Sequence, residues 1–378
     1  KVAQRGRGQA GVLLQSVAPH RNLELGLAFA PVAGHIDDTR DGPQLAHKGF
    51  GDFAQPLQVV ALDPQTDLGR AEGQELRQGR LLLGHGIGEV GEGGQTAAQD
   101  FQRLVDEAYN KFKDVKDGAN ANYIPILDTV PSELFGVAIA TRDGKIYSAG
   151  EQEYRFSIQS VSKPFTAALV MSQQGPKAIR EKIGVEPTGL AFNSKLALEI
   201  YPERSVNPLV NAGAIAAVSL VQASSEEERW KLVHENMEGF AGAKLPVLEE
   251  VYTSEYETCW GNRGIANLLY NWGRLYCEPE EALRVYTREC SVGVNTHDLA
   301  MMGATLANGG VNPLTGRRMM PAEHVPELLA IMATAGFYDE SGEWMYSAGL
   351  PSKTGVGGGI VSVVPGTFAI AAFSPRLN

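Results

Sequence analysis

The sequence predicts an α+β fold, in which an antiparallel sheet is flanked by helices and carries a helical subdomain. Strand patterns occur near both ends of the region after Asp100, at 135–149 and 359–373, and helical patterns fill the chain between them. The first two strands are joined at Asp143-Gly144, a dipeptide typical of a tight antiparallel hairpin. Because strands from both ends must meet in one sheet, the intervening helices form an insertion over it. We expect a sheet subdomain at about 99–160 and 299–378, and a helical subdomain at about 161–298.

The first element of this region is an amphipathic helix. Phe101, Leu104, Val105 and Tyr109 recur at helical spacing, which predicts a helix that ends near Gly118. An extended segment at 122–125 follows, and then the hairpin strands at 135–141 and 145–149.

The middle of the chain is predicted to be mostly helical. Thr296 is the expected N-cap of one of these helices, and Gly309-Gly310 is expected to close it. Helices are expected at 161–173, 177–183, 209–222, 225–240, 262–275, 280–288, 297–308 and 323–335.

The last elements are strands. The apolar and aromatic patterns at 344–350, 359–364 and 367–373 predict three of them, with a turn at Pro365-Gly366 between the last two. The nucleophile described below would then lie at the seam between sheet and helices, a usual place for a pocket.

The first 98 residues differ from the rest in composition. Every Trp, Tyr, Cys and Met lies after Asp100, and the segment before it is rich in Gly and Gln. Apart from possible short strands at 11–17 and 57–62, its apolar periodicity is poor, so we expect a disordered or non-native extension. The segment 86–91 matches G-x-G-x-x-G, but no helical pattern follows it, so dinucleotide binding is not favoured.

Charge and cysteine content limit the function further. The chain has 378 residues and a formal net charge of -11, which argues against nucleic acid and anionic membranes as partners. No apolar run is long enough to span a bilayer. Three cysteines without a C-x-x-C pair favour a reducing, cytoplasmic location. The chain opens on Lys1 and stops soon after a strand, as expected of a processed or partial chain.

Ser160 and Lys163 form an S-x-x-K motif at the start of a predicted helix. The helix N-terminus favours negative charge on a developing alkoxide, and an unprotonated lysine in a dry pocket can accept the serine proton. Pro164 is tolerated in the first helical turn. The alternative for the tetrapeptide alone is an N-cap serine followed by a surface lysine.

A second motif, Lys353-Thr354-Gly355, lies near the C-terminus and precedes a strand pattern. K-T-G accompanies S-x-x-K in penicillin-binding proteins and β-lactamases, where it lies on an edge strand beside the nucleophile. Both motifs occur in that order, so a β-lactamase or D,D-peptidase remains an alternative. A catalytically silent binding protein that keeps the pocket is another.

Four blocks resemble the serine-dependent glutaminases of the bacterial type, which share the β-lactamase-like fold. The resemblance covers about 101–378, and the third block is the most specific, because β-lactamases lack it. The blocks are Asn-Tyr-Ile-Pro at 122–125, Ser-Ile-Gln-Ser-Val-Ser-Lys at 157–163, Asn-Pro-Leu-Val-Asn-Ala-Gly-Ala-Ile at 207–215 and Gly-Leu-Pro-Ser-Lys-Thr-Gly-Val at 349–356.

The resemblance implies a set of site residues. Ser160 is the expected nucleophile, Lys163 its base, and Tyr338 the tyrosine that passes a proton near the nucleophile. The oxyanion hole is expected at the backbone N–H groups of Ser160 and Val356. Expected substrate-binding residues are Tyr123, Asn211, Glu255, Asn262, Tyr286, Tyr338 and Val356.

The implied reaction is hydrolysis of L-glutamine to L-glutamate and ammonia through a serine ester. Glu255 would face the substrate ammonium, while tyrosine and asparagine groups would face its carboxylate. No metal or organic cofactor is expected, because His234, His297 and His324 are scattered without ligand spacing. A homodimer or homotetramer is expected. At Asn262 the chain departs from the family pattern, because relatives have Arg before this Asn where Gly261 stands here. Relatives also continue into a final helix, which we expect to be missing.

Overall fold

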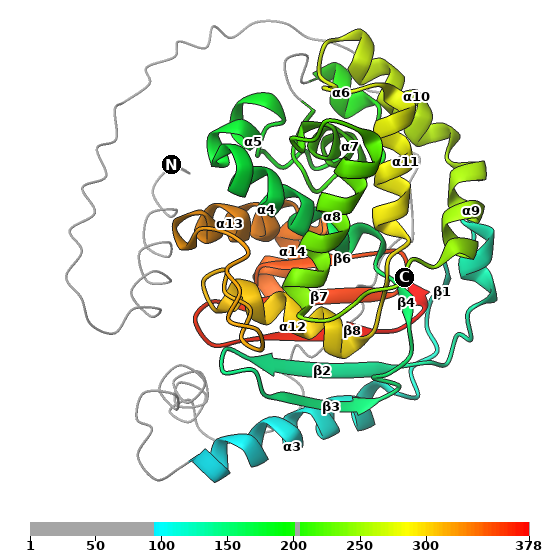
Figure 1. Cartoon of the computed structure of the whole chain (residues 1–378). Helices are drawn as coiled ribbons and strands as arrows, with labels where there is room; N and C mark the ends of the chain where they lie inside the picture. The colour runs from blue at the N-terminus through cyan, green and yellow to red at the C-terminus, as the bar shows by residue number, and fades with distance from the viewer. Residues whose placement is uncertain (1–93, 201–204, 378) are drawn as a thin grey trace, which may run out of the picture. The chain divides into compact units, whose positions relative to one another are not determined.

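A computed structural model describes residues 94–200 and 205–377 (Figure 1). The predictions for the short strands at 11–17 and 57–62 and for the glycine motif at 86–91 lie outside the described residues.

The main sheet has five antiparallel strands in the order β3-β2-β8-β7-β6. Ala371 at the centre of β8 lies opposite Ala138 on one side and Val361 on the other. The predicted sheet, assembled from strands near both ends of the region, is therefore confirmed. The strands are β2 Gly136–Thr141, β3 Ile146–Gly150, β6 Ser352–Thr354, β7 Gly359–Val364 and β8 Phe368–Phe373.

Different helices cover the two faces of this sheet. On one face Val137 and Ile139 pack with Val105 of α3 (Gly94–Phe112), whose Phe101 ring lies 5.2 Å from that of Phe368. On the other face α12 (Thr296–Ala307) packs along β2, β7 and β8 (Figure 1). Successive residues of a strand point to opposite faces, so the continuous apolar run of β2 contacts the helices on both faces of the sheet.

The segment between the hairpin and α12 is helical, as predicted, and it packs into the largest apolar cluster of the described residues. The predicted helices are all present, with ends that differ by a few residues, whereas α6 and α9 were not predicted. The helices are α4 Lys163–Gln174, α5 Pro176–Lys182, α6 Leu196–Ile200, α7 Asn211–Leu220, α8 Glu226–Ala241, α9 Glu249–Thr258, α10 Trp260–Asn271, α11 Pro279–Cys290 and α13 Val325–Ala335.

Short elements complete the structure. Two two-stranded ladders pair β1 (Ala119–Asn120) with β9 (Arg376–Leu377), and β4 (Phe156–Ser157) with β5 (Gly293–Val294). Turns of 3-10 helix occur at η1 Pro125–Thr129, η2 Gln159–Ser162, η3 Ala322–His324 and η4 Tyr338–Glu340. Within residues 94–200 and 205–377, no helix combines the length and apolar character needed to cross a membrane.

The strand predicted at 344–350 is wrong, because Ser341–Ser347 forms the helix α14. Trp344 and Tyr346 suggested an alternating pattern, yet Trp344 is buried and stacked on Phe337 at 4.2 Å, while Tyr346 is 89% exposed. The Trp344 indole also donates to the Leu350 carbonyl oxygen at 3.0 Å. Tertiary packing of Trp344 therefore decides the local structure.

The predicted N-cap of α12 is shifted by one residue. Asn295, not Thr296, caps the helix: its side chain accepts from the Asp298 N–H at 2.9 Å, and Asp298 accepts from the Asn295 N–H at 3.1 Å. This reciprocal capping box satisfies two backbone donors, which a cap at Thr296 would leave unpaired.

Candidate active site

Ser160 lies in the 3-10 turn η2, directly before α4, and only 7% of its surface is exposed. A backbone hydrogen bond holds the start of this turn: the Ile158 N–H donates to the Val292 carbonyl oxygen at 2.8 Å, next to the β4–β5 ladder. Gln159 has a φ of 48°, a left-handed conformation that costs energy in a non-glycine residue. The backbone is therefore bent sharply at the residue that precedes the predicted nucleophile.

Lys163 is the first residue of α4, one turn after Ser160, and 1% of it is exposed. Its Nζ lies 2.7 Å from Asn211 Oδ1 and 5.6 Å from the centre of the Tyr338 ring. Burial lowers the pKa of Lys163 to about 8, while Cys290, Glu289 and Glu255 act in the opposite direction. The amine is thus poised to exchange a proton near neutral pH.

Tyr338 lies beside the same amine, on η4, and its φ of 59° is again left-handed. The ring is held by Lys353 of β6, whose Nζ lies 4.0 Å from the ring centre and donates to the Gly336 carbonyl oxygen at 3.0 Å. Burial raises the pKa of Tyr338, and a hydrogen bond with Ser160 opposes that rise. Burial also holds the pKa of Lys353 well below its ordinary value, aided by the nearby Lys163.

The turn after β6 approaches the nucleophile closely. A Cβ added to Gly355 would lie 3.2 Å from the Ser160 nitrogen and 2.9 Å from the Ile158 carbonyl oxygen, so the glycine permits this approach. In the part of the chain that the structure describes, neither the Ser160 N–H nor the Val356 N–H donates to another protein group. Two unpartnered donors in one narrow region can receive an oxyanion.

These residues meet at a pocket of about 210 Å³, which contains seven of the nine predicted site residues. The other two contact residues of the pocket: Lys163 donates to Asn211, and Tyr338 is hydrogen-bonded with Ser160. The predicted residues that line the pocket are Tyr123, Ser160, Asn211, Glu255, Asn262, Tyr286 and Val356. Asn262 is among them despite the different residues on either side of it in the sequence.

A polar network connects the walls of this pocket. Asn211 Oδ1 accepts from the Tyr286 hydroxyl at 3.3 Å, and Asn211 Nδ2 donates to Asn262 Oδ1 at 2.9 Å. On another wall Glu255, 6% exposed, accepts from Gln159 Nε2 at 3.2 Å. Burial raises the pKa of Glu255 to about 7, against the hydrogen bond from Gln159 and the charge of Lys163. This carboxylate is therefore well suited to a cationic partner.

Sequence reasoning missed three residues near the site. Gln159 lines the pocket beside Ser160, and Phe192 lines it with its ring 5.3 Å from that of Tyr338. Glu289, fully buried on α11, accepts from Ser162 and Thr166. Gln159 directly precedes Ser160, and that position was the one signal in the sequence. Phe192 and Glu289 are distant from the motifs in sequence, so only the fold places them at the site.

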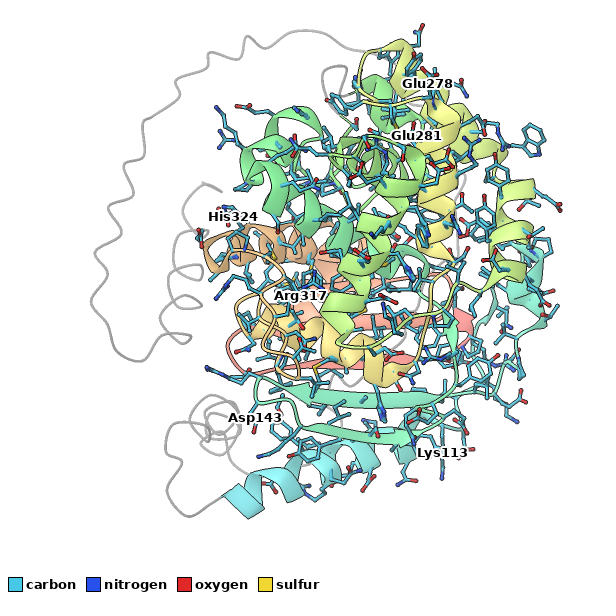
Figure 2. The ribbon with its side chains drawn as sticks, viewed as in Figure 1. Lys113, Asp143, Glu278, Glu281, Arg317 and His324 are labelled. Atoms are coloured by element: carbon cyan, nitrogen blue, oxygen red, sulfur yellow. The ribbon has the colours of Figure 1, made fainter. Side chains whose placement is uncertain are left out.

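The buried charges of the site contrast with those elsewhere. Lys163, Lys353 and Glu289 have at most 1% of their surface exposed. Charged residues such as Asp143 and Arg317 are instead exposed, and Asp143 lies at the edge of the molecule in Figure 2. Burying ionisable groups is costly unless they have partners or a function, so their concentration here marks a functional site.

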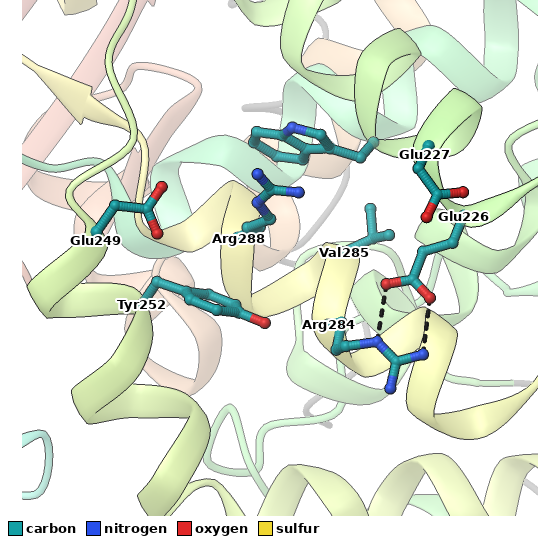
Figure 3. A pocket seen from close by; sticks show the side chains of 8 residues that line it. Glu226, Glu227, Glu249, Tyr252, Arg284, Val285 and Arg288 are labelled. Carbon is teal, nitrogen blue, oxygen red and sulfur yellow. Dashed lines mark hydrogen bonds and ion pairs between the residues drawn. The ribbon is translucent and has the colours of Figure 1, made fainter.

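A second pocket lies on the outer side of α11, between α8 and α9 (Figure 3). Its volume is about 330 Å³, and Arg284 in its wall is paired with Glu226 at 2.7 Å. Arg288 stacks on the Trp230 ring at 4.7 Å. This pocket contains none of the predicted site residues. Across the described residues, no group of three His, Cys, Asp or Glu side chains is placed to hold a metal ion.

Comparison with known proteins gives one consistent result. The family model described as Glutaminase matches residues 118–378. A glutaminase of Mycobacterium ulcerans is 52% identical over 278 residues, 74% of this chain and 87% of the relative. A glutaminase of Colwellia psychrerythraea is 53% identical, over 74% and 89%. A solved structure titled probable glutaminase ybaS superposes with a TM-score of 0.73 and 51% identity, covering 74% of this chain and 91% of that one.

Proposed function

This chain belongs to the glutaminase family and hydrolyses glutamine to glutamate, and we propose that it does so through an ester on Ser160 with Lys163 as base. One observation carries the proposal. The buried amine of Lys163, with its pKa lowered to about 8, donates to Asn211, which lines the same pocket as Ser160 and Glu255.

In acylation the Ser160 Oγ attacks the side-chain amide carbon of glutamine, and its proton passes to Lys163 Nζ. The carbonyl electron pair moves to the oxygen, and the N–H groups of Ser160 and Val356 receive the resulting oxyanion. Their lack of protein partners in the described structure supports this role, because they need not break a bond to accept the charge.

Collapse of the tetrahedral intermediate breaks the carbon–nitrogen bond. The leaving nitrogen takes a proton that comes from Lys163, and Tyr338 is the group that passes it. The hydrogen bond between Tyr338 and Ser160 and the distance of 5.6 Å from Lys163 Nζ to the centre of the Tyr338 ring support this path. Lys353 keeps Tyr338 in its left-handed backbone conformation by bonding the Gly336 carbonyl oxygen two residues earlier.

Deacylation repeats these roles with water as the nucleophile. Lys163 accepts a proton from water, the new oxygen–carbon bond forms, and the ester bond to Ser160 Oγ breaks. Ser160 recovers its proton and glutamate is released.

Substrate selection follows from the charges of free glutamine. Glu255 receives the ammonium group, which restores the ionised form that burial otherwise disfavours. Tyr123, Asn211 and Asn262 offer hydroxyl and amide donors to the carboxylate, while the Tyr286 hydroxyl donates to Asn211 and holds it in place. The amide then lies at the Ser160 end of the pocket, where reaction occurs.

Two further proposals concern the whole protein. We propose that it works in the cytoplasm, because all three cysteines are free thiols and Cys259 and Cys290 are buried. We also propose a homodimer or homotetramer, which light scattering on the purified chain tests directly.

The test of the reaction is ammonia release from glutamine by the purified chain and by Ser160→Ala. We expect the variant to lose at least about a thousandfold in kcat, because alanine removes the attacking hydroxyl of the proposed reaction. Exposed Ser347→Ala on α14 is the matched control and should keep full activity. A chromogenic β-lactam, run in parallel, tests the alternative substrate. Equal ammonia release by wild type and Ser160→Ala would refute Ser160 as nucleophile.

A further inference from the structure

Glu289 is a fully buried carboxylate to which the mechanism above gives no task. It projects from α11 onto the turn that carries the nucleophile. Its Oε1 accepts from Ser162 Oγ at 3.1 Å, and its Oε2 accepts from Thr166 Oγ1 at 2.7 Å. Ser162 and Thr166 are four residues apart, so they lie on one face of the helix start, and Lys163 lies between them in the sequence.

The Ser162 hydroxyl also contacts the Gln159 carbonyl oxygen at 2.8 Å. Glu289, Ser162 and Gln159 thus form a chain of contacts that reaches the strained residue before Ser160. A carboxylate that bridges two hydroxyls at the start of a helix also benefits from the positive end of the helix dipole. These contacts fix the orientation of α4 relative to α11.

Glu289 is one of several ionisable groups around the Lys163 amine. Its effect must therefore be separated from theirs. The others are Glu255 from α9, Tyr286 and Cys290 from α11, Tyr338 from η4 and Lys353 from β6. Burial holds the pKa of the Cys290 thiol well above its ordinary value, so the thiol is neutral near pH 7. Burial also holds the pKa of Lys353 well below its ordinary value. The carboxyl groups left to face Lys163 are those of Glu255 and Glu289, and burial raises the pKa of each to about 7.

Substrate binding distinguishes these two carboxylates. In the proposed reaction Glu255 is occupied by the ammonium of glutamine, so its charge is cancelled when chemistry begins. Glu289 does not line the pocket, so the substrate does not neutralise it. Burial raises the pKa of Glu289 to about 7, against the hydrogen bonds from Thr166 and Ser162 and the charge of Lys163. Protonation of Lys163 therefore favours the ionised form of Glu289. Resting on the proposed function, we propose that Glu289 is a positioning residue that fixes the nucleophile turn and supplies the counter-charge for Lys163 when it becomes an ammonium ion.

The experiment compares the pH dependence of kcat/KM in wild type, Glu289→Gln and Glu289→Asp. Glutamine keeps the size of the side chain and loses the charge, so the pKa of Lys163 should fall. The acidic limb of the kcat/KM profile should then move to lower pH by about one unit, and the high-pH plateau of kcat/KM should fall about tenfold. Asp keeps the charge at shorter reach, so the plateau should fall while the limb stays in place. Glu257→Gln, an exposed carboxylate on α9, is the matched control and should change neither.

Different results would refute the Ser160 reaction and the role of Glu289. If Ser160→Ala remains active, the proposed function is wrong whatever Glu289 does. If Ser160→Ala is inactive but the acidic limb of the Glu289→Gln profile stays at the wild-type pH, Glu289 is structural only and the inference is overturned.

Should Glu289→Gln not fold, the double variant Ser162→Ala/Thr166→Val replaces it, because a carboxylate without donors is neutral over a wider pH range. The acidic limb of the kcat/KM profile of this double variant must then also move to lower pH.

Discussion

Lys163 shows at the scale of one residue how burial changes chemical character. A surface lysine is a permanent cation near neutral pH, whereas burial lowers the pKa of this one to about 8. Roughly one molecule in ten therefore carries the free amine at pH 7. The same desolvation that costs folding energy supplies the base.

This value sets the expected pH profile of the enzyme. The neutral amine is the active form, and it becomes populated as the pH rises above the pKa. We therefore expect kcat/KM to rise tenfold per pH unit below about 8 and to level off above it. Lys163→Arg, whose side chain stays charged, should lose activity by a factor of about 10²–10⁴ across the whole range. Exposed Lys177→Arg on α5 should leave the profile unchanged, and a profile flat from pH 6 to 9 in wild type would exclude Lys163 as base.

At the scale of elements, close approach of α7 to the preceding loop places Asn211 in the pocket. A Cβ on Gly213 would lie 1.8 Å from the Asn207 carbonyl oxygen, which is backbone and cannot turn aside. We expect Gly213→Ala to lower the free energy of unfolding by about 1–3 kcal/mol or more. Because Asn211 would move, kcat/KM should fall as well.

Gly264→Ala is the control for that substitution. Gly264 lies exposed inside α10, and nothing lies within 4 Å of an added Cβ. Alanine should therefore stabilise the protein by about 0.4–1 kcal/mol through the unfolded state. Thermal unfolding of both variants measures the difference, and equal melting temperatures would contradict the close approach seen at Gly213.

The elements also show what the sequence can reveal. The helix α12 was predicted because most of its buried residues are apolar, from Leu299 to Ala307. The helix α9 was missed because only Val251 and Glu255 are buried in it, one turn apart, and the second is the carboxylate of the site. Where a functional group occupies a core position, apolar periodicity disappears. The site residues were found through motif resemblance, whereas Glu289 and Phe192 needed the fold.

At the scale of the whole molecule, we propose that the catalytic domain is the region from about 99 to 378. The predicted site residues span Tyr123 to Val356, and the family match begins at residue 118. Deletion of residues 1–93, which keeps α3 whole, should change kcat/KM by less than about twofold. Circular dichroism and ammonia release check this, and loss of folding in the shortened chain would assign the segment a structural role.

The order of the strands has a consequence for the time course of folding. The central strand β8 pairs with β2, although more than two hundred residues separate them along the chain. On a ribosome adding about 5–20 residues per second, the β2–β3 hairpin must wait on the order of ten seconds or more for this neighbour. Until then the β2 edge is unpaired and open to other chains. A nascent chain that stalls before residue 368 is therefore the species most in need of a chaperone.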